Sequence, residues 1–173
     1  LKAAALLAAR LGQIKFLVVG DGPLKSSLQE LSGQLGLSGK AIFTGFVDDP
    51  AQMPALFAAM DVFCLPTRRE GYGMVVAQAA AMGKPVVASN IAPVNTLLIH
   101  EETGLLAPPD DANAFAEAIQ TLVSDKQRRQ AMGQRARLFA REHCNLEDRF
   151  AEVLETYRKV LAEAGADERG PRR

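Results

Sequence analysis

The sequence of 173 residues contains no tryptophan, and aromatic residues make up only 6% of it. Proteins that bind single-stranded nucleic acids stack bases on aromatic side chains, so this composition argues against a nucleic-acid partner. Lysine plus arginine equals aspartate plus glutamate, so no net charge attracts nucleic acid or an acidic membrane either. The longest apolar runs are far shorter than the roughly 20 residues that a transmembrane helix needs. We therefore expect neither a nucleic-acid partner nor a transmembrane segment.

Cysteine and histidine are also scarce. Cys64 and Cys144 are far apart and have no metal-binding spacing, so we expect both to be free and structural, as is usual in a reducing compartment. Cys64 lies in an apolar run and is expected to be a small buried side chain. His100 and His143 have no evident partners for a Ser-His-Asp set, and we interpret His100 as a loop residue rather than a base. Without a cluster of ligating residues, we expect no metal and no cofactor.

The sequence does contain a regular alternation of apolar, strand-like runs and helix-like segments. Its 48% of hydrophobic residues is enough for one domain with a substantial core. The alternation predicts an α/β fold, a Rossmann-like parallel sheet with helices on both faces. This domain is expected to span residues 1–163, with a Gly-, Pro- and charge-rich disordered tail at 164–173. The predicted strands are residues 14–19, 41–44, 61–65, 86–88 and 103–108, and the predicted helices are residues 1–11, 24–35, 50–60, 111–123, 126–141 and 146–161, with one more that begins at 73 or 74.

Two of these helices carry patterns that predict what their faces do. The helix at 24–35 is amphipathic, because one stripe of it collects Leu24, Leu28, Leu31 and Leu35. The helix at 126–141 is basic on its outer side, where it carries Arg128, Arg129, Arg135, Arg137 and Arg141. Such a run is either an anion-binding patch or a solvated face, and we favour the solvated face.

One stretch has the composition of a ligand-binding turn. Gly71 and Gly73 flank Tyr72, and glycine permits both a sharp turn and a close approach of a ligand to the backbone. The Ala-rich helix that follows begins near Gly73 or Met74, and its first amides have no intrahelical partners and suit a phosphate. Glu70 lies directly before this helix. An acidic side chain beside an anion site is costly unless it binds another part of the ligand, such as sugar hydroxyls.

This stretch resembles the signature of the retaining GT-B glycosyltransferases, the glycosyl transferases group 1 family. In that family a Glu precedes Gly-[Phe/Tyr]-Gly, a second Glu follows, and an Ala-rich helix leads to Gly-x-Pro-Val. The matching residues here are Glu70, Gly71, Tyr72, Gly73, Gly83, Pro85 and Val86. Gln78 stands where the second Glu is expected. The resemblance implies that the chain is the C-terminal, donor-binding half of a GT-B fold.

The resemblance also implies a site. Glu70 would contact the hydroxyls of the donor sugar as the catalytic residue. Gln78 would contact the ribose hydroxyls, without the charge-assisted strength of a carboxylate. The turn that begins at Gly20 would border the donor cleft; the alternative is a plain turn between a strand and a helix. The loop after Gly45 would contact the nucleotide base; the alternative is a loop that simply ends a strand. The expected substrate-binding residues are Gly20, Gly22, Phe46, Val47, Gly71, Tyr72, Gly73, Met74 and Gln78.

Some features depart from the family or leave the site open. After Ser89 the family has a Gly pair and an acidic residue, whereas this chain has Ala92-Pro93 and Thr96. Pro93 has no backbone N–H, so a hydrogen bond to the donor is lost there. Glu70 has an alternative interpretation as a solvated loop carboxylate, or as the partner of one of the two arginines that precede it.

The implied activity belongs to a longer enzyme. It would transfer a sugar from a nucleoside diphosphate sugar to an acceptor glycan or lipid with retention, in polysaccharide or lipopolysaccharide biosynthesis. The acceptor domain and a Gly-Arg…Lys-Gly segment would precede Leu1, so we expect this fragment alone to be inactive. We expect a cytoplasmic protein, with peripheral attachment to the inner membrane face through the missing domain. Two alternatives stay open, a degenerate, non-catalytic nucleotide-sugar-binding or interaction module and a nucleotide-sugar 2-epimerase-like enzyme, and the string 70–87 argues against the epimerase.

Overall fold

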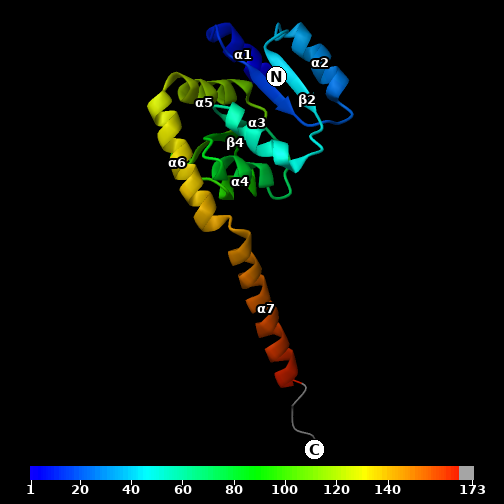
Figure 1. Ribbon diagram of the computed structural model, residues 1–173, viewed down its shortest axis with the longest axis vertical. Coiled ribbons are helices and arrows are strands. Elements are labelled where there is room, and N and C mark those ends of the chain that lie inside the picture. The colour runs from blue at the N-terminus through cyan, green and yellow to red at the C-terminus, as the bar shows by residue number, and fades with distance from the viewer. Residues whose placement is uncertain (168–173) are drawn as a thin grey trace, which may run out of the picture.

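The strands form two parallel sheets (Figure 1). The computed structural model describes residues 1–167, and for residues 146–149 and 165–167 it describes the backbone alone. The smaller sheet pairs β1 (Phe16–Val19) with β2 (Ala41–Gly45). The larger sheet has the order β3-β4-β5, formed by β3 (Phe63–Leu65), β4 (Val86–Ser89) and β5 (Gly104–Ala107). All of these pairs are parallel.

Helices alternate with the strands, which confirms the predicted α/β class with parallel sheets flanked by helices. Two short 3₁₀ turns, Pro50–Gln52 and Val94–Thr96, lie in the connections. The helices are α1 (Lys2–Arg10), α2 (Lys25–Gln34), α3 (Met53–Ala59), α4 (Met74–Ala81), α5 (Ala112–Ser124), α6 (Lys126–His143) and α7 (Leu146–Asp167).

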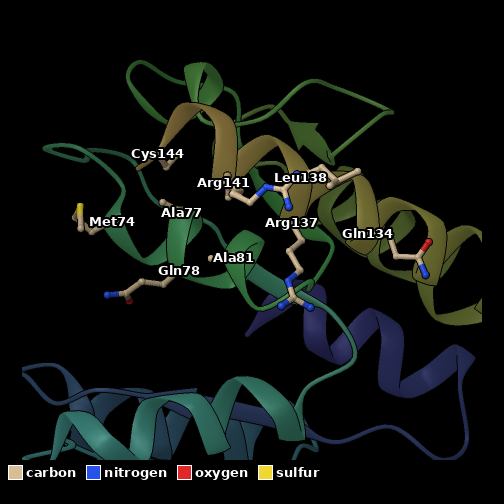
Figure 2. Close-up of a pocket in the computed structure, with 10 residues that line it drawn as sticks. Met74, Ala77, Gln78, Ala81, Gln134, Arg137, Leu138, Arg141 and Cys144 are labelled. Carbon is tan, nitrogen blue, oxygen red and sulfur yellow. The ribbon is translucent and has the colours of Figure 1, made fainter. Parts of the chain in front are cut away.

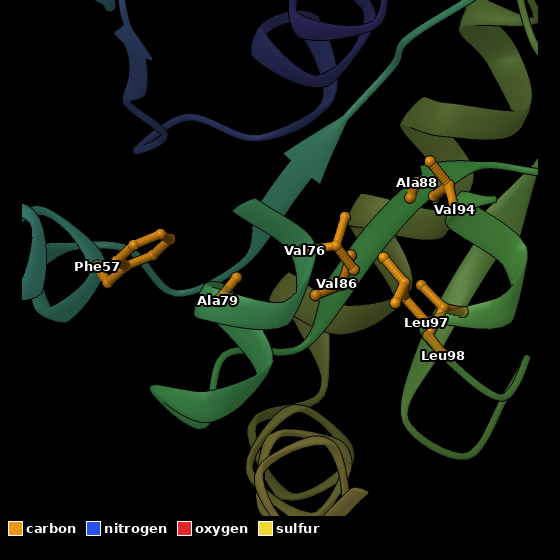
Figure 3. Packing of buried hydrophobic residues seen from close by; sticks show 8 residues of the cluster. All are labelled: Phe57, Val76, Ala79, Val86, Ala88, Val94, Leu97 and Leu98. Carbon is orange, nitrogen blue, oxygen red and sulfur yellow. The ribbon is translucent and has the colours of Figure 1, made fainter. Parts of the chain in front are cut away.

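The larger sheet lies at the centre of the core. All four residues of β4 are buried, as expected of a parallel strand that is covered on both faces. One face packs on α3 and α4 through a cluster comprising Phe57, Val76, Ala79, Val86, Ala88, Val94, Leu97 and Leu98 (Figure 3). The other face packs on α5 and α6 through Val87, Leu105, Ala107, Phe115, Leu122 and Met132. The strand alternation therefore sends successive residues of β4 into two different clusters.

The smaller sheet is covered less completely. Leu17 and Val19 of β1 are 37% and 39% exposed, and Ile42 of β2 is 51% exposed. The leucine stripe predicted for residues 24–35 is not a buried stripe either, because Leu24 is 66% exposed and Leu28 is 36% exposed. The predicted helix is present, with Leu31 and Leu35 half-buried and the N-terminal end of the stripe exposed.

Arginine side chains of α6 take part in the packing of the helices. Arg129 donates from Nη1 to the carbonyls of Leu122 and Val123 at 3.0 Å each, at the C-terminal end of α5. Its Nη2 lies 3.3 Å from Oδ1 of Asp61. Arg135 donates from Nε to the carbonyl of Glu102 at 2.8 Å. These contacts satisfy helix-end carbonyls and loop carbonyls. The solvated-face interpretation is wrong for Arg129, whose side chain is only 17% exposed, whereas Arg135 is exposed as predicted.

The last helix extends away from the rest of the molecule (Figure 1). Its apolar side chains, among them Phe150 and Tyr157 at 65% each, are exposed. Because α7 continues to Asp167, residues 164–167 of the predicted tail are helical. Residues 168–173 of that tail lie outside the described residues.

Candidate functional site

Loops at the carboxyl ends of the strands carry most of the residues that the sequence singled out. After β1 and β2, Gly20 and Gly45 both have left-handed backbones, with φ of 122° and 76°. The amide of Gly20 donates to the carbonyl of Gly45 at 3.0 Å, which joins the two loops. Gly22 and Phe46 follow in these loops, and the Phe46 ring is 71% exposed. Ligands of parallel α/β sheets bind outside this end of the strands.

Asp21 holds these two loops together, and the sequence analysis did not identify it. Its Oδ1 accepts from the amide of Gly22 at 2.8 Å, and its Oδ2 forms an ion pair with Nζ of Lys25 at 2.7 Å. The hydrogen bond from Lys25 is the main reason that the pKa of Asp21 is lowered, and the amides of Gly22 and Phe46 contribute too. The sequence signal that could have identified this ion pair is the spacing of Asp21 and Lys25, an acid and a lysine four residues apart.

The turn after β3 requires a glycine at its last position. Gly73 has φ of 86° and forms the N-cap of α4. A Cβ on this residue would lie 2.8 Å from Cδ1 of Leu97, so both backbone and space exclude a larger side chain. The first helical bond to its carbonyl comes from Val76 at 2.8 Å. The amides before Val76 belong to the unpaired first turn of the helix, as the sequence predicts.

Glu70 lies against this turn and is half-buried. Its Oε1 accepts from the amide of Gly71 at 3.0 Å, which leaves acceptor sites on the carboxylate for a ligand. The alternative that pairs Glu70 with Arg68 is not what the structure has, because Arg68 donates from Nε to Oδ1 of Asp110 at 2.7 Å. Thr67 also closes the loop, since its Oγ1 donates to the carbonyl of Arg69 at 2.6 Å.

A groove between α4 and α6 contains a second group of the predicted residues (Figure 2). Met74 and Gln78 project from α4, and Arg137 and Arg141 line the same groove from α6. The groove has a volume of about 880 Å³. Gln78 is exposed, so its amide is accessible to a ligand. The structure therefore brings Gln78 and Met74 together, whereas Glu70 lies at the N-terminal end of α4.

The loop that departs from the family packs beneath the turn. Val94 and Leu97 are buried, and both lie within 4 Å of where a Cβ on Gly73 would be. Thr96, at the position where the family has an acidic residue, donates from Oγ1 to the carbonyl of Pro93 at 2.7 Å. This loop therefore supports the shape of the turn, whatever it contributes to a ligand.

Neither histidine lies in a site. His100 accepts at Nδ1 from the amide of Leu106 at 3.0 Å, in keeping with its interpretation as a loop residue. His143 stacks on Phe139 with ring centroids 4.3 Å apart. Burial raises the pKa of the Cys64 thiol to about 12, as expected of an inert side chain.

Among the side chains that the structure describes, those of residues 1–145 and 150–164, no three or more of His, Cys, Asp or Glu are arranged to hold a metal ion. Among the helices of the same part of the chain, none combines the length and the hydropathy that crossing a bilayer requires.

Comparison with known proteins adds a family to this geometry. The sequence profile described as "Glycosyl transferases group 1" matches residues 1–139. A D-inositol 3-phosphate glycosyltransferase of Corynebacterium urealyticum is 33% identical over 181 residues, which cover 99% of this chain and 42% of that protein. An alpha-D-kanosaminyltransferase of Streptomyces kanamyceticus is 32% identical over 136 residues. The match covers 79% of this chain and 35% of that protein. The chain thus spans less than half the length of these relatives.

Solved structures show the same fold. Sucrose-phosphate synthase from Thermosynechococcus elongatus superposes with a TM-score of 0.84 at 29% identity, covering 94% of this chain and 42% of that one. HepE of Anabaena, solved in complex with UDP, superposes with a TM-score of 0.77 at 28% identity, covering 89% of this chain and 44% of that one.

Proposed function

This chain belongs to the glycosyl transferases group 1 family, and we propose that it is the donor-binding half of a retaining glycosyltransferase. The complete enzyme would transfer a sugar from a nucleoside diphosphate sugar to an acceptor glycan or lipid. Its acceptor domain would lie in the part of the longer protein that this chain does not span, so residues 1–173 alone would bind a donor without transferring it. The UDP complex of HepE supports a nucleotide donor of this class.

The observation that carries this proposal is the turn before α4. Gly73 bends the chain so that the unpaired amides of the first helical turn follow directly after Glu70. The amides and the positive end of the helix dipole suit the diphosphate, and the carboxylate of Glu70 suits paired sugar hydroxyls. The positive end of the helix and the negative carboxylate of Glu70 would then bind different parts of one ligand, the diphosphate and the sugar.

Catalysis in this proposal comes from position and electrostatics. The amides of Tyr72, Gly73 and Met74 would stabilise the negative charge that develops on the leaving diphosphate. The amide of Gly71 would instead hold the Glu70 carboxylate in place. Glu70 would orient the sugar so that its anomeric carbon faces the acceptor. Gln78 would bind the ribose from the groove beside α6. This scheme uses no metal and no cofactor. We also propose that the complete enzyme is cytoplasmic and attaches to the inner membrane face through its other domain.

The loops of the smaller sheet would hold the other end of the donor. Gly20 and Gly22 lie in the loop after β1, and Phe46 and Val47 lie in the loop after β2. The two loops are joined by the hydrogen bond from the amide of Gly20 to the carbonyl of Gly45. The exposed Phe46 ring and the backbone of Val47 would contact the nucleotide base. The ion pair of Asp21 with Lys25 would hold the loop after β1 in this conformation.

Calorimetry with the longer protein tests this assignment. We expect one of UDP-, GDP- or ADP-sugars to bind, and Glu70→Gln to weaken the sugar nucleotide more than the free nucleoside diphosphate, because Glu70 contacts the sugar. We expect a loss of about 1–3 kcal/mol, the value of a hydrogen bond to a charged group. Glu117→Gln, on an exposed position of α5, is the matched control and should change neither affinity.

Two results would contradict this part of the proposal. If none of the three sugar nucleotides binds the longer protein, the site is not a donor site. If Glu70→Gln weakens the free diphosphate and the sugar nucleotide equally, Glu70 does not recognise the sugar.

A non-catalytic binding module is the second candidate, and the amide at Gln78 favours it. If the site is a working donor site, Gln78→Glu should strengthen nucleotide binding several-fold, because a carboxylate accepts from both ribose hydroxyls with charge assistance. The measurement is the affinity for the nucleoside diphosphate with and without the ribose 2′-hydroxyl. A gain that disappears with the 2′-deoxy nucleotide supports ribose recognition, and no gain at all supports the non-catalytic module.

A further inference from the structure

One ion pair ties the turn before α4 to another part of the molecule. Nε of Arg68 donates to Oδ1 of Asp110 at 2.7 Å. The other hydrogen bonds of the turn, made by Thr67 and Glu70, lie within it. In the described part of the chain, no other hydrogen bond or ion pair joins residues 66–72 to a different element. This contact therefore restrains the turn that carries Glu70.

The ion pair crosses the end of a strand. Arg68 follows β3 and Asp110 follows β5, and these two strands pair with β4 on its two sides. They lie about 10 Å apart, which is twice the spacing of paired strands. The pair therefore spans the carboxyl end of β4, at the edge of the sheet where ligands of parallel α/β proteins bind.

The backbone of Asp110 is unusual for an aspartate. Its φ is 65°, in the left-handed region that favours glycine. An aspartate is strained there relative to glycine, although it tolerates this conformation better than most residues. Backbone outliers of this kind cluster at functional sites, so the position calls for a use of the side chain. The carboxylate that a glycine would lack is the one that binds Arg68.

The loop that carries Asp110 is a firm support. Pro108 and Pro109 precede it, and the ring of each proline fixes its own φ. Asp111 follows it and caps α5, since Oδ1 of Asp111 accepts from the amide of Ala114 at 2.9 Å. Asp110 therefore lies between a proline pair and the start of a helix that packs in the core.

We propose that Arg68 and Asp110 are positioning residues, whose ion pair holds the turn so that Glu70 meets the donor sugar. This role rests on the proposed function, because the ligand of the turn is the sugar nucleotide proposed for it. The two side chains are 79% and 62% exposed, and exposed ion pairs contribute little to stability. The pair therefore acts on the geometry of the turn rather than on the stability of the fold.

A double-mutant cycle in the longer protein tests this role. Arg68→Ala and Asp110→Gly should each weaken binding of the sugar nucleotide about two- to fivefold, the range that exposed ion pairs contribute. The double variant should bind no more weakly than either single variant, because both changes remove the same interaction. Calorimetry with the sugar nucleotide that binds the wild-type protein gives the affinities. If the two effects multiply, Arg68 acts on the donor by itself and the positioning role is wrong.

Asp110→Gly also separates positioning from folding. It removes the carboxylate and relieves the left-handed strain, which offsets the flexibility that glycine adds. Urea denaturation should therefore show no loss of stability, although binding of the donor weakens.

Glu101→Gly is the matched control for this variant. Among the described residues, Glu101 is the other non-glycine residue with a left-handed backbone, at φ of 66°. It precedes β5, at the opposite end of the strands from the turn. Glu101→Gly should change neither stability nor affinity. If it weakens donor binding as much as Asp110→Gly does, flexibility rather than the ion pair is responsible and the positioning role is wrong.

NMR order parameters give a measurement without any nucleotide. In the wild-type protein, the amides of Glu70 and Gly71 should have order parameters near the value of about 0.85 for rigid backbone. Arg68→Ala and Asp110→Gly should each lower them toward about 0.6, the value of flexible backbone. Unchanged order parameters in both variants would overturn the positioning role.

A failure of this role can be told from a failure of the donor site. If the wild-type protein binds no sugar nucleotide, the proposed function is wrong, and the role of the ion pair is wrong with it. If the wild-type protein binds one and neither ion-pair variant changes the affinity, the donor site stands and only the positioning role is wrong.

Discussion

At the residue scale, the site depends on one backbone angle. Gly73 is the N-cap of α4 with φ of 86°, and this left-handed conformation turns the chain from β3 into a helix whose first amides are unpaired. Leu97 and Val94 fill the space behind it, at 2.8 Å and 3.8 Å from the position of a Cβ. The geometry of the turn and the packing of the loop that departs from the family are therefore coupled.

Gly73→Ala should weaken both the fold and donor binding. The added Cβ meets Cδ1 of Leu97 and forces a left-handed alanine, and together these cost about 1–3 kcal/mol of unfolding free energy. Gly71→Ala is the control, because it has no neighbour within 4 Å and no left-handed backbone, and it should change stability little. Urea denaturation measures the stability and calorimetry measures the affinity. An unchanged affinity in a folded Gly73→Ala variant would remove this turn from the donor site.

At the element scale, local patterns predicted the strands and helices well, whereas pairings distant in sequence were not predictable. The Gly71-Tyr72-Gly73 turn and the helix after it follow from glycine and alanine content. The salt bridge from Arg68 to Asp110 joins two loops that the sequence gives no reason to connect. The same applies to Arg129, which a charge run presents as solvated but which binds the end of α5.

The division of the strands into two sheets was not predictable for a similar reason. Alternating strands and helices predict parallel pairing, but they do not say which strands are neighbours. The structure pairs β1 with β2 and separates them from the larger sheet. The leucine stripe of residues 24–35 is another example, since Leu24 and Leu28 at its N-terminal end are exposed. An amphipathic pattern predicts a buried face only when another element is present to cover it.

The packing of α6 on the end of α4 depends on two glycines, and substitution tests it. A Cβ on Gly133 would lie 2.2 Å from the carbonyl oxygen of Gly83 and 3.1 Å from its carbonyl carbon. Both atoms belong to the backbone, so Gly133→Ala should separate the helices and cost about 1–3 kcal/mol of unfolding free energy. Gly33→Ala, in α2 with nothing within 4 Å, should instead stabilise the chain by about 0.5–1 kcal/mol. If both variants stabilise the chain, the helices do not pack this closely.

At the scale of the whole molecule, two parts differ in how they are stabilised. The α/β body buries its side chains in clusters on both faces of the larger sheet. α7 instead extends from the body with an exposed apolar stripe, including Phe150, Tyr157 and Leu161. A helix without packing contributes little to stability, because most helical stability in proteins comes from burial of an amphipathic face.

Removal of α7 should therefore leave the body as stable as before. A chain that ends at residue 145 should unfold in urea with a free energy within about 0.5 kcal/mol of the value for residues 1–173, because surface changes away from packed features have effects of this size. Leu122→Ala, in the fully buried cluster between α5 and the larger sheet, is the positive control and should cost about 2–5 kcal/mol in both chains. Hydrogen exchange should show the amides of α7 opening independently of β4, whose four residues are buried. A loss of more than about 1 kcal/mol on truncation would mean that α7 folds onto the body in solution, since a side chain left exposed has no burial energy to lose.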